Sequence, residues 1–259
     1  HAVSVAVGVD VGATKLAAAR VDTASGAILV ALRRPTLPAR GGDAVLADVR
    51  AMAQELGGRA GLAVCELVGP DGRVRSAETV DWRGADLGAF AAVESDVRAA
   101  AIAEARFGAG RAQPDFLYVS VGSGISHCLV ADGRPRAGVH GSAICTGAPL
   151  VEEWSSGLAL ARRSGHATAE EALADPAAEA VVEEGAARLG VVLAVLVNAL
   201  DPGAVVVGGG LGLHDGYRGR VERALRGAVY DDAVRELPVV PAALGADAPV
   251  IGAALAATP

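Results

Sequence analysis

The chain has 259 residues, is 52% hydrophobic and 3% aromatic, and carries a formal net charge of −7, so it can bury an Ala/Val/Leu core in one large or two modest domains. Its acidic balance excludes a basic nucleic-acid surface, and no apolar run is long enough to span a membrane. The three cysteines, Cys65, Cys128 and Cys145, show no CxxC spacing and no signal peptide opens the chain, which together predict a cytoplasmic protein.

The first predicted element is a strand over residues 3–9, which leads into a short polar tip before residues 16–22 resume the strand pattern. Small residues in such a tip let backbone amides approach phosphate oxygens. The hydroxyl and ammonium groups add donors, and the carboxylate can hold Mg²⁺ directly or through water. The stretch therefore favours a nucleotide site over an ordinary tight turn with a solvated lysine. The residues concerned are Asp10, Gly12, Ala13, Thr14 and Lys15.

A third strand over residues 28–32 completes an antiparallel start, which is unlike a Rossmann domain because helices intervene there. Asp81 and Trp82 lie in a later loop. Trp82 is either a half-buried loop anchor or one wall of a pocket for a polyol. Between and after these segments we expect a helix over residues 43–56, a strand over 61–67 and a short helix near 87–90.

A helix over residues 97–107 begins just after Ser95 and Asp96. Asp96 can simply cap this helix. Alternatively, a carboxylate at a helix start can act as a general base that accepts the proton of a hydroxyl attacking a γ-phosphoryl group. Ser95 would then hydrogen-bond a neighbouring hydroxyl.

A second predicted hairpin repeats the first. Strands over residues 116–121 and 125–131 flank a tip made of Gly122, Ser123 and Gly124, and Asp132-Gly133 predicts a tight turn at the far end. Two such tips, facing each other across a cleft, can grip phosphates from both sides.

The stretch over residues 138–149 is irregular and carries His140 and Cys145. Four zinc ligands are not visible there, so we expect no zinc site. A helix over residues 152–163 begins with Glu152, which either interacts with the helix dipole or faces a sugar hydroxyl.

A glycine run, Gly208 to Gly210, follows a predicted strand over residues 204–207. It either lets a nucleotide lie on the backbone or forms a structural bend, and the chain has no GxGxxG fingerprint and no Walker A motif. The other helices expected in this part span residues 175–200, 217–226 and 249–257.

Together these segments resemble the ROK family of sugar kinases, within the actin/hexokinase/Hsp70 ATPase superfamily. Residues 10–15 resemble the family's DxGxTK phosphate motif, and Ser95-Asp96 with residues 104–110 resemble its catalytic segment. The other matching segments are residues 121–125 (second phosphate segment), 198–202 with the glycine run (adenosine segment) and 243–254 (C-terminal signature).

The chain also departs from the family pattern. Residues 140–149 are shortened and lack the Glu-x-Gly-His segment and the cysteine run that bind zinc and shape the sugar site in the family. Ser95 replaces the usual Asn, and Ser126-His127 replaces part of a glycine run. Glu152 keeps its family spacing to Ser156-Gly157. The ATP half thus resembles the family, whereas the acceptor half argues against ordinary glucose specificity.

The resemblance implies two α/β domains of the ribonuclease H-like (actin-like ATPase) type that flank a cleft. One would span residues 1–111 plus the C-terminal helix at about 246–259, and the other residues 112–245. It further implies an ATP- and Mg²⁺-dependent kinase that works as a homodimer, with Asp96 as the base, ATP bound by both tips and the glycine run, and domain closure excluding water. Residues expected around a hexose, aminosugar or sugar-like cyclitol are Asp81, Trp82, Ser95, His140 and Glu152.

Two other functions stay open. One is a non-catalytic sugar sensor, although Asp96 together with Lys15 argues against a degenerate module. Family repressors carry an N-terminal DNA-binding domain, which is not expected here because the phosphate hairpin begins within ten residues of the start. The other is a phosphotransferase of the superfamily with a non-sugar acceptor.

Overall fold

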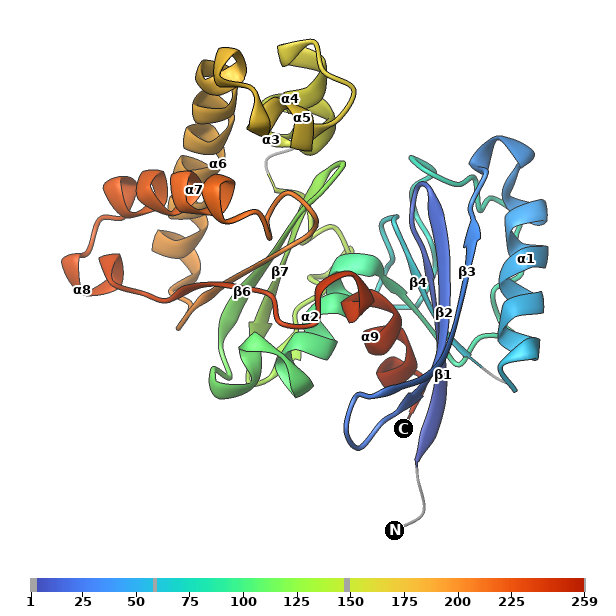
Figure 1. The fold of residues 1–259 in the computed structure, drawn as a ribbon. Helices are drawn as coiled ribbons and strands as arrows, with labels where there is room; N and C mark the ends of the chain where they lie inside the picture. The colour runs from blue at the N-terminus through green and yellow to red at the C-terminus, as the bar shows by residue number, and fades with distance from the viewer. Residues whose placement is uncertain (1–3, 58–59, 147–149, 259) are drawn as a thin grey trace. The chain divides into compact units, whose positions relative to one another are not determined.

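The computed structural model describes residues 4–57, 60–146 and 150–258 and divides the chain into two units (Figure 1). Each unit contains a mixed sheet with helices, which confirms the predicted α/β class. Residues 134–144 lie in the first unit, whereas the sequence analysis groups them with residues 112–245. The first unit comprises His1–Gly108, Arg134–Ile144 and Asp247–Pro259, and the second comprises Ala109–Gly133 and Cys145–Ala246.

The first unit is built on a sheet with the strand order β3-β2-β1-β4-β5. The three N-terminal strands are antiparallel, as predicted, whereas β4 runs parallel to both β1 and β5. This mixed pattern is the ribonuclease H-like arrangement expected from the family resemblance. The strands are β1 (Val5–Val11), β2 (Lys15–Asp22), β3 (Ile28–Pro35), β4 (Ala60–Val64) and β5 (Ala92–Ser95).

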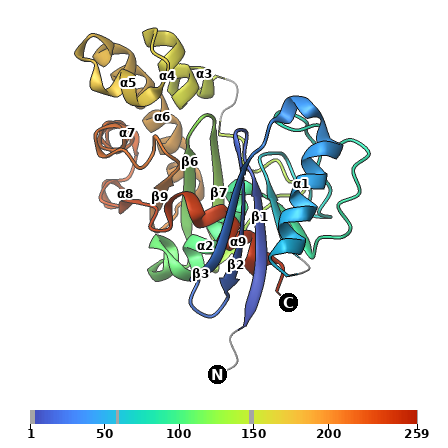
Figure 2. The same ribbon diagram turned by 45° about the vertical axis from the view of Figure 1, so that its right-hand side comes forward.

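Helices cover both faces of this sheet, with α1 (Gly42–Glu55) on one side and α2 (Asp96–Phe107) and α9 (Ala248–Ala256) on the other (Figures 1 and 2). The helix α1 buries Val45, Val49 and Met52, whose spacing places them on one face of the helix. Short 3₁₀ segments, η1 (Pro38–Arg40) and η4 (Gly245–Asp247), precede α1 and α9.

The C-terminal helix α9 packs so closely on the sheet that its backbone meets the backbone of the strands. A Cβ atom added to Gly8 of β1 would lie 2.0 Å from the carbonyl oxygen of Val250, and one added to Gly61 of β4 would lie 1.9 Å from that of Ala253. Because no side chain fits in this gap, both strands need glycine where the helix crosses them. The last helix of the chain is therefore an integral layer of the first unit.

The second unit repeats the same strand pattern. Its central strand β6 (Phe116–Val121) pairs antiparallel with β7 (Ile125–Ala131) and parallel with β9 (Val205–Gly208), which pairs with β10 (Val239–Pro241). After β7 comes the predicted turn, where Asp132 and Gly133 both have positive φ angles. The two-residue β8 (Arg134–Pro135) follows, at the start of the segment that belongs to the first unit. The repeat seen in the two sequence hairpins is thus a repeat of sheet topology.

Two long helices, α6 (Glu179–Leu200) and α7 (Asp215–Ala228), pack against each other and against the apolar core on one side of this sheet (Figure 1). Among the residues that the structure describes, no helix is long and apolar enough to cross a membrane. The remaining elements are η2 (Ala109–Ala112), α3 (Glu152–Ser155), α4 (Gly157–Ser164), α5 (Ala169–Ala174), η3 (Pro176–Ala178) and α8 (Asp232–Arg235).

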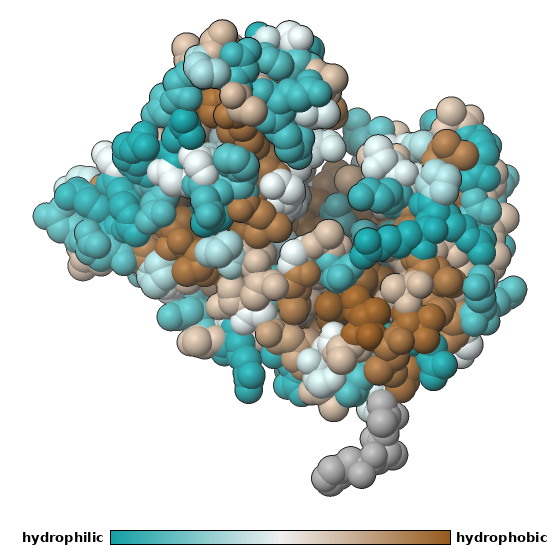
Figure 3. Space-filling model, in the orientation of Figure 1, coloured by the Kyte–Doolittle hydropathy of each residue, from teal (hydrophilic) through white to brown (hydrophobic). Residues whose placement is uncertain are grey.

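Charged and apolar residues are unevenly spread over the surface. In the space-filling view hydrophilic residues dominate around α8, whereas apolar residues gather on the first unit near α9 (Figure 3). The edge strand β3 of that unit also leaves Leu29 and Val30 about half exposed.

Two local predictions were wrong, and one strand was missed. The short helix near residues 87–90 is a turn, in which Leu87 accepts a hydrogen bond from Phe90 N and Asp86 binds Gly88 N. The helix over residues 152–163 is two helices, because Ser156 leaves the helical conformation and caps α4 by accepting from Ala159 N at 3.2 Å. The strand β5 was not predicted, since its four residues are too short for a periodic signal.

Candidate active site

Three parallel strands of the first unit end side by side and bring the predicted acidic residues together. Asp10 on β1 pairs with Ala63 on β4, which pairs with Glu94 on β5. Asp96 directly follows β5 as the first residue of α2. The carboxyl ends of parallel strands are the usual ligand-binding edge of an α/β sheet. Asp10, Ser95 and Asp96 therefore share one edge of the first unit.

The two carboxyl groups at this edge are poorly solvated. Burial, and to a smaller extent the nearby Asp96 carboxylate, raise the pKa of Asp10 to about 8. Burial also raises the pKa of Asp96, while the hydrogen bond from Val97 N, at 2.7 Å, partly opposes that shift. Neighbouring carboxylates of this kind need a proton or a cation between them.

Asp10 fits the role of a magnesium ligand. Its Oδ1 atom is buried and has no hydrogen-bond partner among the described residues. Magnesium in proteins is commonly held by one or two carboxylates together with phosphate oxygens and water. No group of three or more His, Cys, Asp or Glu side chains suited to a metal occurs in the described part of the chain, so a cation at Asp10 would need such outside ligands.

Asp96 does not cap α2 in the usual way. The capping position is Ser95, whose side chain makes no capping bond. Among backbone amides, Asp96 accepts from that of the next residue, Val97, rather than from one two or three positions on. The Ser95 hydroxyl is fully buried and finds no partner within the described residues. The arrangement favours a base over a simple cap.

Cys65, directly after β4, lies beside the two carboxyl groups and was missed by sequence reasoning because it belongs to no motif. Its thiol is near enough to the side chains of Asp96 and Thr79 to interact with both. The Asp96 charge, and then burial, raise the pKa of this thiol, so it stays protonated at neutral pH. The thiol can therefore donate to the Asp96 carboxylate.

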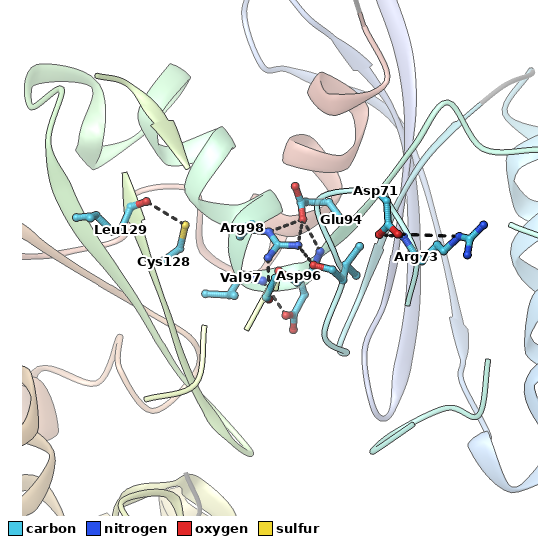
Figure 4. A network of polar contacts seen from close by, with 11 residues as sticks. Asp71, Arg73, Glu94, Asp96, Val97, Arg98, Cys128 and Leu129 are labelled. Atoms are coloured by element: carbon cyan, nitrogen blue, oxygen red, sulfur yellow. Dashed lines mark hydrogen bonds and ion pairs between the residues drawn. The ribbon is translucent and has the colours of Figure 1, made fainter. Parts of the chain in front are cut away.

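A buried arginine anchors the start of α2. Arg98 is 1% exposed and pairs with Glu94, toward which its guanidinium points in Figure 4. It also donates to the carbonyl oxygens of Val68 at 2.7 Å and Gly141 at 3.1 Å. The guanidinium thus connects the helix that carries Asp96 to two loops, one of which contains His140.

Thr36 supports the first predicted phosphate tip, over residues 12–15, through two hydrogen bonds. Sequence reasoning also missed this residue. The Thr36 hydroxyl donates to Gly12 O at 2.7 Å, and its amide donates to Thr14 O at 3.1 Å. Within the described residues, the amides of Ala13 and Thr14 have no partner and Lys15 forms no ion pair. The tip therefore offers amides and an ammonium group to an anion.

The second tip, in the other unit, is supported in a comparable way. Gly122 donates to Gly124 O at 2.9 Å, and Gly157 donates to Gly122 O at 2.7 Å. The Glu152 carboxylate accepts from Ile125 N at 2.8 Å. The amides of Ser123 and Gly124 have no partner in the described part of the chain. Glu152, predicted at the acceptor, is here bonded to the phosphate tip of its own unit.

Two roles were predicted for the glycine run at the end of β9, a structural bend and an open backbone for a nucleotide. Gly209 has φ +78°, and a Cβ there would lie 2.4 Å from Val121 O, so the bend and the close packing require glycine. Gly210 is exposed, and a Cβ there would meet nothing within 4 Å. Gly209 thus serves the bend, whereas Gly210 leaves its backbone open to a ligand.

Two of the predicted acceptor residues are engaged locally. Asp81 forms an ion pair with Arg83 at 2.6 Å, and its hydrogen bonds to that arginine lower the pKa of Asp81 to about 2. Trp82 is 5% exposed and belongs to the apolar core, although its Nε1 atom has no partner among the described residues. A cavity of about 730 Å³ is lined by Trp82, Arg83 and Phe90 but does not reach Asp96.

The shortened loop after β8 is only partly described, since residues 147–149 lie outside the described ranges. His140 is exposed, and so is Cys145. The next residue, Thr146, forms a 2.9 Å hydrogen bond with the buried His127 ring. Among the described residues, His140 and Cys145 belong to no group of three or more side chains that could hold a metal ion.

Comparisons with known proteins agree with this geometry. A sequence profile of the ROK family matches residues 6–258. The chain is 33% identical, over 96% of its length, to the bifunctional enzyme NanE/NanK of Brucella melitensis, of which it spans about half (53%).

Two solved structures are similar over nearly their full lengths. The ROK hexokinase of Thermus thermophilus is 29% identical, with a TM-score of 0.80 and coverage of 98% of this chain and 97% of that one. The ROK glucokinase of Streptomyces griseus, solved with glucose and AMPPNP, is 26% identical, with a TM-score of 0.81 and coverage of 97% and 98%.

Proposed function

The chain belongs to the ROK family, and on this basis we propose that it transfers the γ-phosphoryl group of ATP to a hydroxyl group of a sugar or a sugar-like cyclitol. The observation that carries the proposal is the pair of partly buried carboxyl groups, Asp10 and Asp96, at the carboxyl edge of the first sheet. The relatives named as a hexokinase and a glucokinase support the same reaction class.

Asp96 is the general base in this proposal. It accepts the proton of the acceptor hydroxyl as the oxygen attacks the γ-phosphorus, and the terminal P–O bond of ATP breaks to release ADP. Its raised pKa suits proton transfer near neutral pH better than that of an exposed carboxylate. The neighbouring Cys65 thiol, which interacts with Asp96, helps to hold the carboxylate in place.

Each of the two hairpin tips offers groups that suit the phosphates of ATP. Each tip presents backbone amides without a described partner, at Ala13 and Thr14 in one unit and at Ser123 and Gly124 in the other. Lys15 adds a positive charge, and Gly210 gives the nucleotide an open stretch of backbone. Phosphoryl transfer depends on such positioning and charge neutralisation rather than on covalent catalysis.

Asp10 would hold Mg²⁺, directly or through water. When bound, the ion would neutralise charge on the phosphate oxygens, which is its usual contribution to this chemistry. Asp10 itself orients the site, because its position in β1 is fixed by pairing with both β2 and β4.

The acceptor is a ring compound with several hydroxyl groups. Ser95 is the best-placed of the predicted acceptor residues, because its buried hydroxyl adjoins the base and lacks a described partner. His140 is exposed and can also reach a ligand, whereas Asp81 is bonded to Arg83 and Trp82 is largely buried. Glu152 would contribute only on leaving Ile125 N.

An ATP-consumption screen tests the proposal. ADP release should be stimulated by at least one member of a panel of hexoses, aminosugars and C7-cyclitols in the presence of Mg²⁺. Binding of a panel compound without ADP release would instead support a sensor. Stimulation only by non-ring alcohols would support a different phosphotransferase.

A further inference from the structure

The first unit contains a buried carboxylate that the proposed reaction does not use. Glu66, two residues after β4, is 4% exposed. Its carboxylate accepts hydrogen bonds from three consecutive backbone amides, Glu78 N at 2.9 Å, Thr79 N at 2.7 Å and Val80 N at 3.0 Å. It also accepts from the hydroxyl of Ser76. These charge-assisted bonds satisfy a group that would otherwise be costly to bury.

The segment that Glu66 holds has no other regular structure. Residues 76–80 contain no helix or strand, and Glu66 binds the amides of the last three. Ser76 adds one link, because its hydroxyl oxygen accepts from Leu67 N at 2.9 Å. The conformation of this segment, hereafter the 76–80 loop, is therefore set mainly by one carboxylate.

The 76–80 loop lies near the general base. The Cys65 thiol interacts with the side chains of both Thr79 and Asp96, and the charge of Glu66 also acts on Asp96. The amide of Thr79 is the one bound most closely by Glu66, so Glu66 fixes the residue that begins this chain of contacts.

The phosphate tip of the same unit is held by different groups. Thr36 bonds Gly12 and Thr14 and, among the described residues, forms no hydrogen bond with the 76–80 loop. A change in the conformation of the 76–80 loop should therefore affect an acceptor bound beside Asp96 more than phosphates bound at the tip.

We propose that Glu66 is a positioning residue that holds the 76–80 loop beside Asp96 and thereby sets the position of the acceptor hydroxyl. This inference rests on the proposed kinase function and deepens it. In this proposal Glu66 acts through Thr79 and Cys65, in addition to the direct effect of its charge on Asp96. A displacement of about 1 Å at a reacting centre can cost roughly 10²-fold in rate, so a fixed loop has kinetic value.

The test compares Glu66→Gln with Glu78→Gln. Both changes remove one negative charge from the same region, but Glu78 is exposed and contributes only its backbone amide to the contact. The Gln amide group presents donors to backbone amides that are themselves donors, so at least one bond is lost. Steady-state kinetics are measured with Mg²⁺·ATP and whichever of glucose, an aminosugar or a C7-cyclitol the wild type phosphorylates fastest.

For Glu66→Gln we expect kcat/KM for the acceptor to fall about 10- to 100-fold, while the KM for ATP stays within about twofold. Glu78→Gln should leave both constants unchanged. An unchanged acceptor KM and kcat in Glu66→Gln would overturn the inference, as would an equal rise in the KM for ATP, which indicates general distortion. Inactivity of the wild type with every acceptor would instead refute the proposed function.

A second variant covers the case in which Glu66→Gln does not fold. Ser76→Ala removes one donor to Glu66 and the link to Leu67 N, and it leaves the buried charge with its three amides. It should reduce acceptor kcat/KM several-fold with an unchanged KM for ATP. Wild-type kinetics in a folded Ser76→Ala protein would then contradict the proposal.

Discussion

The hydroxyl of Thr36 donates to the carbonyl oxygen of Gly12 over 2.7 Å, and this bond joins the end of β3 to the first phosphate tip. Thr36 is fully buried, so the Gly12 carbonyl would lose its partner if the hydroxyl were removed. Thr36→Val keeps the shape but leaves the carbonyl unpaired, which costs about 1–3 kcal/mol. We expect the KM for ATP to rise about tenfold, since 1.4 kcal/mol corresponds to that factor.

Thr23→Val is the matched control for this prediction. Its hydroxyl also donates to a backbone carbonyl, Ser4 O at 2.9 Å, but at the exposed far end of the same strands. The control should keep the wild-type KM for ATP. A Thr36→Val enzyme that is less stable but binds ATP normally would show that Thr36 supports the fold and not the tip.

Asp96→Asn should abolish phosphoryl transfer and leave ATP binding intact. An amide cannot accept the hydroxyl proton, and loss of a general base typically costs roughly 10²–10⁴-fold in turnover. ATP affinity is measured by calorimetry with Mg²⁺ present. Asp43→Asn is the control, because Asp43 is another acidic residue in the first turn of a helix but is exposed. Near-normal turnover of Asp96→Asn would leave Asp96 as a structural residue at a helix start.

The raised pKa of Asp10 predicts an unusual pH dependence of stability. Its folded pKa of about 8 exceeds the ordinary value of 3.8, so between these values the folded chain binds more protons than the unfolded chain. The contribution of Asp10 to the free energy of unfolding is therefore largest at low pH and declines as the pH rises toward 8. Ionisation of this buried group destabilises the fold.

Asp10→Asn removes that decline. We compare the free energy of unfolding at pH 5 and pH 8, in the presence of EDTA. It should fall more in the wild type than in Asp10→Asn, and the difference should reach up to about 4 kcal/mol, since one pH unit corresponds to about 1.36 kcal/mol. Urea denaturation at both pH values measures the difference. Parallel pH profiles for the two proteins would mean that Asp10 is ionised and hydrated in the folded state.

The parts of the fold that were predictable from the sequence are those with local signals. Both phosphate hairpins alternate apolar strands with small polar tips, and their strands were placed within a few residues of the observed bounds. Asp96 could be predicted as a site residue because it stands at a helix start, in a segment that resembles the catalytic segment of the family. These features depend on neighbours in the sequence.

The residues that sequence reasoning missed act over long sequence distances. Thr36 binds a carbonyl 24 positions away, and Arg98 binds Gly141, 43 positions away. Glu66 meets the amides of Glu78, Thr79 and Val80 only after the chain has doubled back. A single threonine, arginine or glutamate carries no periodic signal, so their partners are visible only in the folded chain.

The protein should contain no stoichiometric zinc. Cys128 is buried in β7, Cys65 lies beside Asp96, and Cys145 is exposed, so the three thiols belong to different surroundings. Zinc in structural sites takes four ligands, commonly with several cysteines. Elemental analysis of protein purified without chelator checks this, and one zinc per chain would reveal ligands beyond those recognised here.

The last prediction concerns the preferred acceptor. The chain lacks the Glu-x-Gly-His segment of the family within residues 140–149, so fewer side chains are available to bind hydroxyl groups near the anomeric end of a sugar. A site that hydrogen-bonds a hydroxyl rejects an analogue without it by about 10⁴–10⁵, whereas a site without such partners discriminates weakly. Arg98 holds Gly141 in place, so the described part of this loop is anchored without those contacts.

We therefore expect a modified hexose or a carbocyclic sugar analogue to be preferred over glucose. The measurement is kcat/KM for glucose, aminosugars and C7-cyclitols at the same concentrations of ATP and Mg²⁺. His140→Ala provides a further check, with Val139→Ala as the control because both side chains are exposed on the same loop. If His140 contacts the acceptor, only its variant raises the acceptor KM. A clear preference of the wild type for plain glucose would contradict the prediction, because other residues would then have to replace the missing contacts.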